Sequence, residues 1–211
     1  MRPMRRDAAN VLASGCAALA AVLFAPGAWA ADVNALVETC ASCHGNDGVS
    51  AEADVPTIAG YSAQYISEQL KAYQKKERPC PETDVRSGAK KGTKSDMCQV
   101  AKDLGDSDID HLASFFEKKK FVAAQQSFDA ALAAKGKEIH DANCDKCHQQ
   151  NGTRPDDDAG ILAGQRMQYL KAQFEDFKAG TRTMLKSMKT KIDKLQKEDV
   201  DALVNYYGSL K

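Results

Sequence analysis

Long hydrophobic runs are absent from this chain of 211 residues. The longest extends from Val11 to Phe24, which is shorter than the stretch of about 20 residues that a membrane-spanning helix needs. An excess of basic charge is absent as well, because residues 31–211 carry 26 basic and 28 acidic side chains. Nucleic-acid binding requires a concentrated basic surface. We therefore expect no transmembrane segment beyond residue 30 and no nucleic-acid partner.

Sustained alternation of apolar and polar residues, typical of a half-buried strand, is also missing. Apolar residues recur at helical spacing instead, as in Ile66, Leu70 and Tyr73 and in Leu170, Phe174 and Phe177. The sequence therefore predicts an all-α fold. Ser107 and Asp110 have the spacing of a capping box, which predicts a helix that begins there.

The first thirty residues have the composition of a secretory signal peptide. Arg2, Arg5 and Arg6 form a basic head, the apolar run follows, and Ala28-Trp29-Ala30 supplies the small residues of a cleavage site. We predict that residues 1–30 are cleaved and that the mature protein is exported to the periplasm. An uncleaved N-terminal anchor is the alternative.

The remainder of the chain repeats itself. At an offset of 104 residues, the pattern Cys40-Ala41-Ser42-Cys43-His44 returns as Cys144-Asp145-Lys146-Cys147-His148. The same offset aligns further pairs, Tyr65 with Tyr169 and Gln69 with Gln173. Nearer the end the match resumes at an offset of 91, so the first half has 13 extra residues between Tyr73 and Met97. We predict two tandem domains, residues 31–117 and 130–211, joined by a linker at 118–129.

Each domain of about 80 residues has few large apolar side chains and hence a thin hydrophobic core. Something other than packing is expected to stabilise it, and the cysteines suggest what. There are two C-x-x-C pairs, each followed directly by a histidine: Cys40, Cys43 and His44, then Cys144, Cys147 and His148. C-x-x-C-H is the attachment sequence of a c-type haem, in which two thiols bond to the macrocycle and the histidine ligates iron.

Two other chemistries use C-x-x-C pairs. A zinc site made from both pairs would have about 15–20 residues between them, and here 100 residues intervene. Each repeat alone offers too few further ligands for a tetrahedral zinc site. A dithiol redox pair would need a βαβ context, which the helical pattern lacks. We therefore predict two covalently bound haem c groups, which would also supply the apolar bodies that the thin cores lack.

An electron-carrying haem needs a sixth iron ligand, and methionine opposite histidine raises the reduction potential. Met97 lies seven residues before Leu104, and Met188 lies seven before Leu195, so the repeat aligns the two methionines. We predict Met97 and Met188 as the sixth ligands. Packing of each methionine against the neighbouring helix is the alternative.

Other candidate side chains fit simpler roles. Met184 has no counterpart in the first half, and His111 and His140 have the positions of ordinary helix residues. Cys80 and Cys98 flank the extra segment of the first half. Because an exported protein meets an oxidising compartment and these cysteines have no other partner, we predict a disulfide between them. Two free thiols are the alternative.

With these motifs the chain resembles the dihaem cytochromes c of the c4 type, which consist of two fused class I cytochrome c domains, each wrapped around one covalent haem. Residues 40–48, residues 58–60 and the aligned methionines carry the likeness. The resemblance implies four axial iron ligands: His44, Met97, His148 and Met188. It also implies that the Pro56 carbonyl holds the ring of the first haem-ligating histidine; Gly160 occupies the matching place in the second half.

The linker and the second half more narrowly resemble the cytochrome subunit of flavocytochrome c sulfide dehydrogenase. Residues 126–132, 139–141, 144–148 and 161–165 carry this likeness, as does Gln149 where a glycine usually follows C-x-x-C-H. The resemblance implies a heterodimer with a flavoprotein subunit, which carries FAD and oxidises sulfide. This chain would do no substrate chemistry; it would pass the electrons singly to a soluble acceptor cytochrome. A free-standing c4-type cytochrome that delivers electrons to a terminal oxidase is the alternative.

Overall fold

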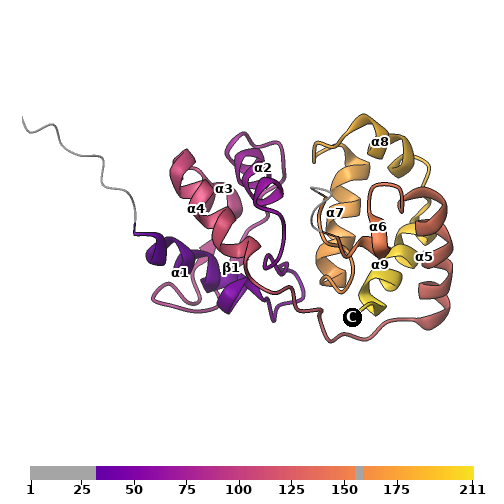
Figure 1. Ribbon diagram of the computed structural model, residues 1–211, viewed down its shortest axis with the longest axis horizontal. Coiled ribbons are helices and arrows are strands. Elements are labelled where there is room, and N and C mark those ends of the chain that lie inside the picture. The colour runs from indigo at the N-terminus through magenta and orange to yellow at the C-terminus, as the bar shows by residue number, and fades with distance from the viewer. Residues whose placement is uncertain (1–31, 155–158) are drawn as a thin grey trace, which may run out of the picture.

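The computed structural model describes residues 32–154 and 159–211. The predicted signal peptide lies outside these residues. Figure 1 shows two helical units side by side, with the chain crossing between them once along the lower edge. This is the predicted all-α arrangement of two tandem units. Within the described residues, no helix is both long enough and apolar enough to cross a membrane.

The first unit is built around three helices of 12 residues each and carries a small sheet. Its elements are α1 (Val33–His44), the 3-10 turn η1 (Asn46–Gly48), α2 (Ala63–Gln74), β1 (Thr83–Asp84), β2 (Lys94–Ser95), α3 (Met97–Ala101) and α4 (Asp106–Glu117). The strands β1 and β2 pair antiparallel, with Thr83 opposite Ser95. This hairpin lies inside the extra segment of the first half, so the departure from an all-helical unit is confined to the insertion.

The second unit repeats the helical part without the sheet. Its elements are α5 (Ala130–Asn143), α6 (Gln149–Gly152), α7 (Met167–Ala179), α8 (Lys186–Ile192) and α9 (Lys197–Ser209). Helix α5 packs along α9, and α7 packs against α9. The helices α2 and α4 pack together in the corresponding way in the first unit.

The start of α4 differs from the sequence prediction. The helix begins at Asp106 and not at Ser107, and the side chain of Asp108 accepts a hydrogen bond from the Gly105 N–H at 3.0 Å. Asp108 is therefore the third helical residue, where a carboxylate can reach back to the N-cap backbone. The second unit uses the same device, since Asp199 accepts from the Gln196 N–H at 3.0 Å.

Each unit has its own hydrophobic core, centred on its last long helix. In the first, Ile109, Leu112 and Phe116 of α4 are at most 1 % exposed. In the second, Leu203 and Tyr207 of α9 are equally buried. These are the apolar stripes that the helical spacing of the sequence predicts, and each core is small.

The segment predicted as a linker, 118–129, packs on the protein. Ala124 is buried, and its N–H donates to the Gly164 carbonyl at 2.8 Å. The Gln126 side-chain amide donates to the Gln165 carbonyl and accepts from the Met167 N–H, at 2.8 and 3.1 Å. The connection is therefore packed against the second unit through these bonds, and its Phe121 packs against the first core, so it is not a free tether.

Candidate haem-binding sites

The first C-x-x-C-H motif occupies the last turns of α1. Cys40 and Cys43 are three residues apart on the helix and so share a face. The helix stops at Gly45, whose φ of 78° is open to glycine and not to ordinary residues. A Cβ built there would lie 2.1 Å from the Val49 carbonyl oxygen. Gly45 thus allows the chain to leave the helix directly after His44.

His44 has the geometry of an iron ligand. Its side chain is buried, and its Nδ1 lies 2.8 Å from the Pro56 carbonyl oxygen. Burial lowers the pKa of His44, and the hydrogen bond to Pro56 offsets this only in part. The ring is therefore neutral, with Nδ1–H donated to the carbonyl and the Nε2 lone pair available to a metal.

The first thiol of the motif, Cys40, lies in an apolar environment. Burial raises the pKa of Cys40 to about 12, so the sulfur stays uncharged at neutral pH. A zinc ligand or a reactive redox cysteine needs the thiolate. Cys40 packs against the first hydrophobic cluster, so a large apolar group bound there would lie beside its sulfur.

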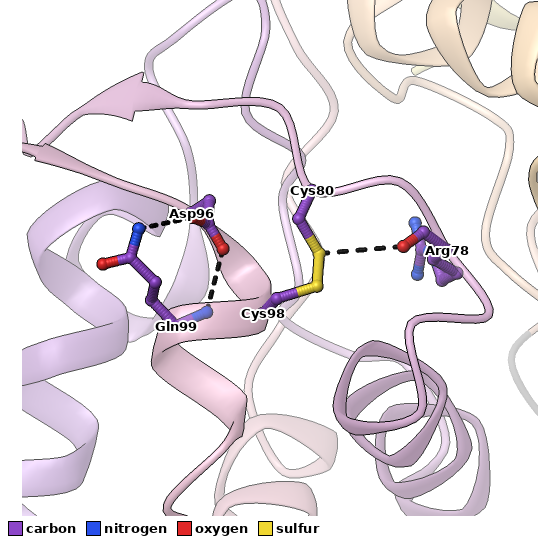
Figure 2. The surroundings of a disulfide bond; sticks show 5 residues. All are labelled: Arg78, Cys80, Asp96, Cys98 and Gln99. Carbon is purple, nitrogen blue, oxygen red and sulfur yellow. Dashed lines mark hydrogen bonds between the residues drawn. A yellow bond between two sulfur atoms is a disulfide. The ribbon is translucent and has the colours of Figure 1, made fainter.

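Met97, on helix α3, packs against the same hydrophobic cluster as Cys40. It is the first residue of α3, and it packs with Cys40 and Leu104 against the first core. Asp96 caps this helix by accepting from the Gln99 N–H at 2.8 Å. Directly after Met97, Cys98 forms a disulfide with Cys80 (Figure 2). The start of α3, which carries Met97, is therefore joined covalently to the chain before β1.

The insertion also touches the attachment motif. The backbone N–H groups of Arg86 and Ser87 donate to the carbonyl of Ser42, at 2.9 and 3.0 Å. Ser42 lies between the two attachment cysteines. The Arg86 guanidinium pairs in turn with Asp54 at 2.9 Å. The segment between Cys80 and Cys98 therefore contacts α1 through Arg86 and Ser87, and it is joined to the start of α3 by the disulfide.

The second C-x-x-C-H motif adopts a different backbone. Helix α5 ends at Asn143, so Cys144 to His148 lie in turns. Gln149 stands where the first half has Gly45, whose φ of 78° and ψ of 168° form a conformation that favours glycine. The positive φ values fall later, at Gln150, Asn151 and Gly152. At Gly152 the hydrogen bonding of the two halves is the same again. The Gly152 carbonyl accepts from the Leu162 N–H at 2.8 Å, and the Gly48 carbonyl accepts from the Ile58 N–H at the same distance.

The methionines of the second half lie around the second core. Met188, on α8, and Met184, before it, both pack against this cluster. The buried Tyr207 of the same cluster interacts with the Cys144 thiol, whose pKa is raised by burial. The structure thus brings one predicted attachment cysteine and a methionine to one core in each half, Cys40 with Met97 and Cys144 with the second-half methionines, and it does not choose between Met184 and Met188.

Of the two histidines expected to be ordinary, His140 is structural. It is fully buried, and its Nδ1 lies 2.9 Å from the Tyr207 hydroxyl. Its Nε2 is 3.6 Å from Asp145, one residue beyond Cys144. Burial lowers its pKa, so the ring is neutral. His140 therefore links the second attachment loop, through Asp145, to Tyr207 of α9.

Each half has two free thiols, one of which lies at its core together with a methionine, and Cys80 and Cys98 are already joined to each other. In the first half a neutral, oriented imidazole completes the set. These donors fit a six-coordinate haem iron bound by histidine and methionine. Sequence reasoning did not single out three buried side chains between the halves, Arg78, Arg182 and Gln165.

Comparison with known proteins defines the class. Residues 30–119 match the cytochrome c family model, and residues 131–206 match the model of the cytochrome c oxidase, cbb3-type, subunit III. The crystal structure of reduced recombinant cytochrome c4 from Pseudomonas stutzeri superposes with a TM-score of 0.68 and 28% identity, covering 86% of this chain and all of that one. The chain is a dihaem electron-transfer protein with two tandem cytochrome c domains and two covalently bound haem c groups.

Two relatives of known name show which cytochrome family the chain belongs to. Cytochrome c4 of Stutzerimonas stutzeri is 30% identical over 82% of this chain and 85% of its own length. The thiosulfate dehydrogenase electron acceptor of Stutzerimonas stutzeri (strain A1501) is 32% identical over 79% of both chains. The chain belongs to the cytochrome c4 family.

Proposed function

We propose that this chain works in the periplasm as the electron-transfer subunit of a sulfide-oxidising complex. In this proposal it forms a heterodimer with a flavoprotein subunit that carries FAD and oxidises sulfide, and it passes the electrons to a soluble acceptor cytochrome. The observation that carries the proposal is that one chain packs two cytochrome domains directly against each other. Gln165, in the second domain, bonds to Thr57 and Tyr61 of the first at 2.8 to 3.0 Å.

When bound, each haem supplies a one-electron couple. In our proposal Cys40 and Cys43 fix the first group and Cys144 and Cys147 the second. His44 and His148 would each bind iron, and the sulfur atoms of Met97 and Met188 would each supply the further ligand that keeps small molecules from it. The protein is then not itself an enzyme, since its own side chains only hold, orient and shield the redox centres.

Two centres in one chain suit a two-electron donor. A reduced flavin holds two electrons, and each iron takes one. With both domains held together, this chain can receive the pair in two steps and release the electrons one at a time. A single-domain cytochrome would have to dissociate and be replaced between the two steps.

The sulfur-compound donor is supported from two sides. The linker and the second half resemble the cytochrome subunit of flavocytochrome c sulfide dehydrogenase, including Gln149 after the second motif. Two relatives are named as the electron acceptor of a thiosulfate dehydrogenase. The relatives named cytochrome c4 favour a second candidate function, a free-standing shuttle that delivers electrons to a terminal oxidase.

Charge suggests which half meets an acidic partner. Residues 31–117 carry 9 basic and 15 acidic side chains, whereas residues 130–211 carry 14 and 12. Lys186 and Lys191 on α8 are exposed beside Met188, and Leu185 just before them is 77 % exposed. An exposed leucine near two exposed lysines, close in sequence to the predicted haem ligand Met188, fits transient docking that is steered by charge.

The experiment is rapid-mixing reduction of the purified holoprotein by sulfide, with and without the flavoprotein fraction from the native periplasm. Sulfide can reduce haem directly, so the rate without the fraction is the baseline. We expect the fraction to raise the rate at least tenfold and to contain a flavoprotein that co-purifies with the tagged chain. Thiosulfate in place of sulfide tests the other sulfur donor.

A charge-reversed variant provides a matched pair. Lys186→Glu with Lys191→Glu should slow transfer at low salt to whichever partner docks on the second half, and added salt should reduce the difference. Lys90→Glu with Lys91→Glu, in the exposed insertion, is the control. If sulfide reduction is the same with and without the fraction and no flavoprotein co-purifies, the shuttle is the better account.

A further inference from the structure

The two halves are held together by a pair of residues that the repeat makes equivalent. Tyr61 and Gln165 occupy matching places at the offset of 104 residues, and so do Thr57 and Ile161. The Tyr61 hydroxyl donates to the Ile161 carbonyl of the second half at 3.0 Å. The Gln165 amide donates to the Thr57 carbonyl of the first half at 2.8 Å. Each half therefore bonds to the same backbone position of the other.

The Gln165 amide uses both of its ends at this interface. Its Oε1 accepts from the Thr57 N–H and from the Arg166 N–H, each at 3.0 Å. Its Nε2 donates to the Tyr61 hydroxyl at 2.9 Å as well as to the Thr57 carbonyl. Gln165 is fully buried, and Thr57 and Tyr61 are only 2 % and 5 % exposed. The amide is therefore fixed by four hydrogen bonds in a buried site.

The Thr57 N–H belongs to the peptide group that orients His44. This peptide group joins Pro56 to Thr57, and its carbonyl, that of Pro56, accepts from the His44 Nδ1–H at 2.8 Å. Its N–H is the group that donates to Gln165 Oε1. Hydrogen bonds at the two ends of one peptide group strengthen each other, because each polarises the group in the same direction. Gln165 therefore makes the Pro56 carbonyl a stronger acceptor for His44.

Other bonds hold the segment around Thr57 in place. The Thr57 hydroxyl accepts from the Ser50 N–H at 3.2 Å, and the Arg166 guanidinium donates to the Ser50 carbonyl. Ser50 is itself buried. Because these bonds do not use the Gln165 amide, we expect them to keep the segment in position when that amide is replaced.

The second half is built differently at the corresponding place. Gly160 stands where the first half has Pro56. The Tyr61 hydroxyl donates to the Ile161 carbonyl, which belongs to the peptide group after the one that joins Gly160 to Ile161. The bond from Tyr61 therefore does not polarise the peptide group that corresponds to the one at His44.

We propose that Gln165 of the second half is a positioning residue for His44 of the first: it strengthens the hydrogen bond that the His44 ring donates and thereby lowers the reduction potential of the first haem. A ligating histidine is more basic when its other ring nitrogen donates a strong hydrogen bond. A more basic ligand stabilises ferric iron more than ferrous iron. The inference rests on the proposed role of His44 as an iron ligand and is independent of the proposed electron donor.

The test measures the potential of each haem in the purified dihaem protein. A redox titration followed by NMR uses the paramagnetic shifts of the His44 and His148 rings, which report the two haems separately. Gln165→Met keeps the length of the side chain and removes the amide. We expect it to raise the reduction equilibrium constant of the first haem about threefold, which is about 28 mV at about 59 mV per tenfold change. The second potential should stay unchanged.

A second readout follows the hydrogen bond itself. In the reduced protein, the NMR signal of the His44 Nδ1–H should move upfield in Gln165→Met, because a weaker hydrogen bond leaves the proton more shielded. The corresponding signal of His148 should not move. Neither measurement uses sulfide or a flavoprotein, so a negative result would leave the proposed function untouched.

Tyr61→Phe is the matched control. It removes two bonds of the interface, those to Ile161 and to the Gln165 Nε2, but keeps the bond from the Thr57 N–H to Gln165. It should leave both potentials unchanged. A purely structural role for Gln165 predicts a different result, since an interface opened to water stabilises the charge of ferric iron and lowers both potentials.

The proposal is overturned by an unchanged or lowered first potential in Gln165→Met, or by an equal shift in Tyr61→Phe. Should Gln165→Met not load both haems, Gln165→Asn provides the same test, because its amide is one methylene group too short to keep the bond to Thr57. An unchanged first potential in Gln165→Asn would then overturn the proposal equally.

Discussion

In the first half both attachment cysteines and His44 lie on α1, whereas in the second half α5 ends at Asn143 and the attachment residues lie in turns. One difference in sequence accompanies this change. Gly45 takes a backbone conformation that favours glycine, Gln149 occupies the matching position, and the second half leaves its helix earlier. Both routes converge on the same hydrogen bond at Gly48 and Gly152. Duplicated domains can thus keep a cofactor site while changing the backbone that presents it.

The halves also differ in what supports the site from outside. The first has the β1–β2 hairpin on Ser42 and the disulfide beside Met97. The second has the buried His140–Tyr207 pair beneath its attachment loop. The first half is therefore braced by a covalent bond and backbone contacts, and the second by side-chain packing. We expect the two halves to respond unequally when equivalent parts are removed.

The largest effect is expected when attachment cysteines are removed. Cys40→Ala with Cys43→Ala, or Cys144→Ala with Cys147→Ala, should lower the haem content from two groups to one. Because the cores are thin, the half that loses its haem should also lose helix, and the braced first half should lose less. Mass spectrometry of the covalent adduct and far-ultraviolet circular dichroism measure both effects. Retention of two haems in either double variant would contradict the assignment.

Removing a sixth ligand should change one iron centre and leave the haems attached. Met97→Ala should let carbon monoxide bind the first reduced haem, and Met188→Ala should do the same at the second. The test of the repeat alignment is Met184→Ala, which should leave the spectrum unchanged although Met184 packs against the same core as Met188. Carbon monoxide binding in Met184→Ala but not in Met188→Ala would reverse the assignment.

Local patterns in the sequence predicted the helices and the paired motifs, because helical spacing and C-x-x-C-H are each read within a few residues. The hairpin escaped prediction, since its strands have two residues each and show no alternation. The cap of α4 was misplaced by the same local reasoning. Asp108 and Asp110 both follow the loop, and only the backbone decides which carboxylate reaches Gly105.

The two buried arginines between the halves were within reach of the sequence and were still missed. Arg78 and Arg182 are related by the same offset of 104 residues as the motifs, which was the available signal. Arginine is usually exposed, however, so a repeated arginine gives no reason to expect burial. Only the three-dimensional structure reveals that the side chains of Gln69 and Gln173 each accept hydrogen bonds from both arginines.

Opening the disulfide should weaken the first half selectively. Cys80→Ser with Cys98→Ser releases a loop with a sequence separation of 18, which the chain-entropy model values at about 3 kcal/mol. We expect thermal unfolding to show a lower midpoint for the first half and an unchanged one for the second. The weak near-infrared band of a methionine-ligated ferric haem should diminish at the first site only, because Met97 adjoins the released bond. Equal loss at both sites would show that the bond does not act through the Met97 loop.

The smallest effects concern the residue after each motif. Gly45→Ala puts a Cβ against the Val49 carbonyl in a conformation that favours glycine, so we expect about 2 kcal/mol of lost stability in the first half. Gln149→Gly makes the second motif like the first, and its turn accepts either residue, so the change should stay below about 1 kcal/mol. Denaturant unfolding of the holoprotein, followed at each haem, measures both. If Gln149→Gly costs as much as Gly45→Ala, then Gln149 contributes contacts of its own, and the second turn is more than a substitute for a missing glycine.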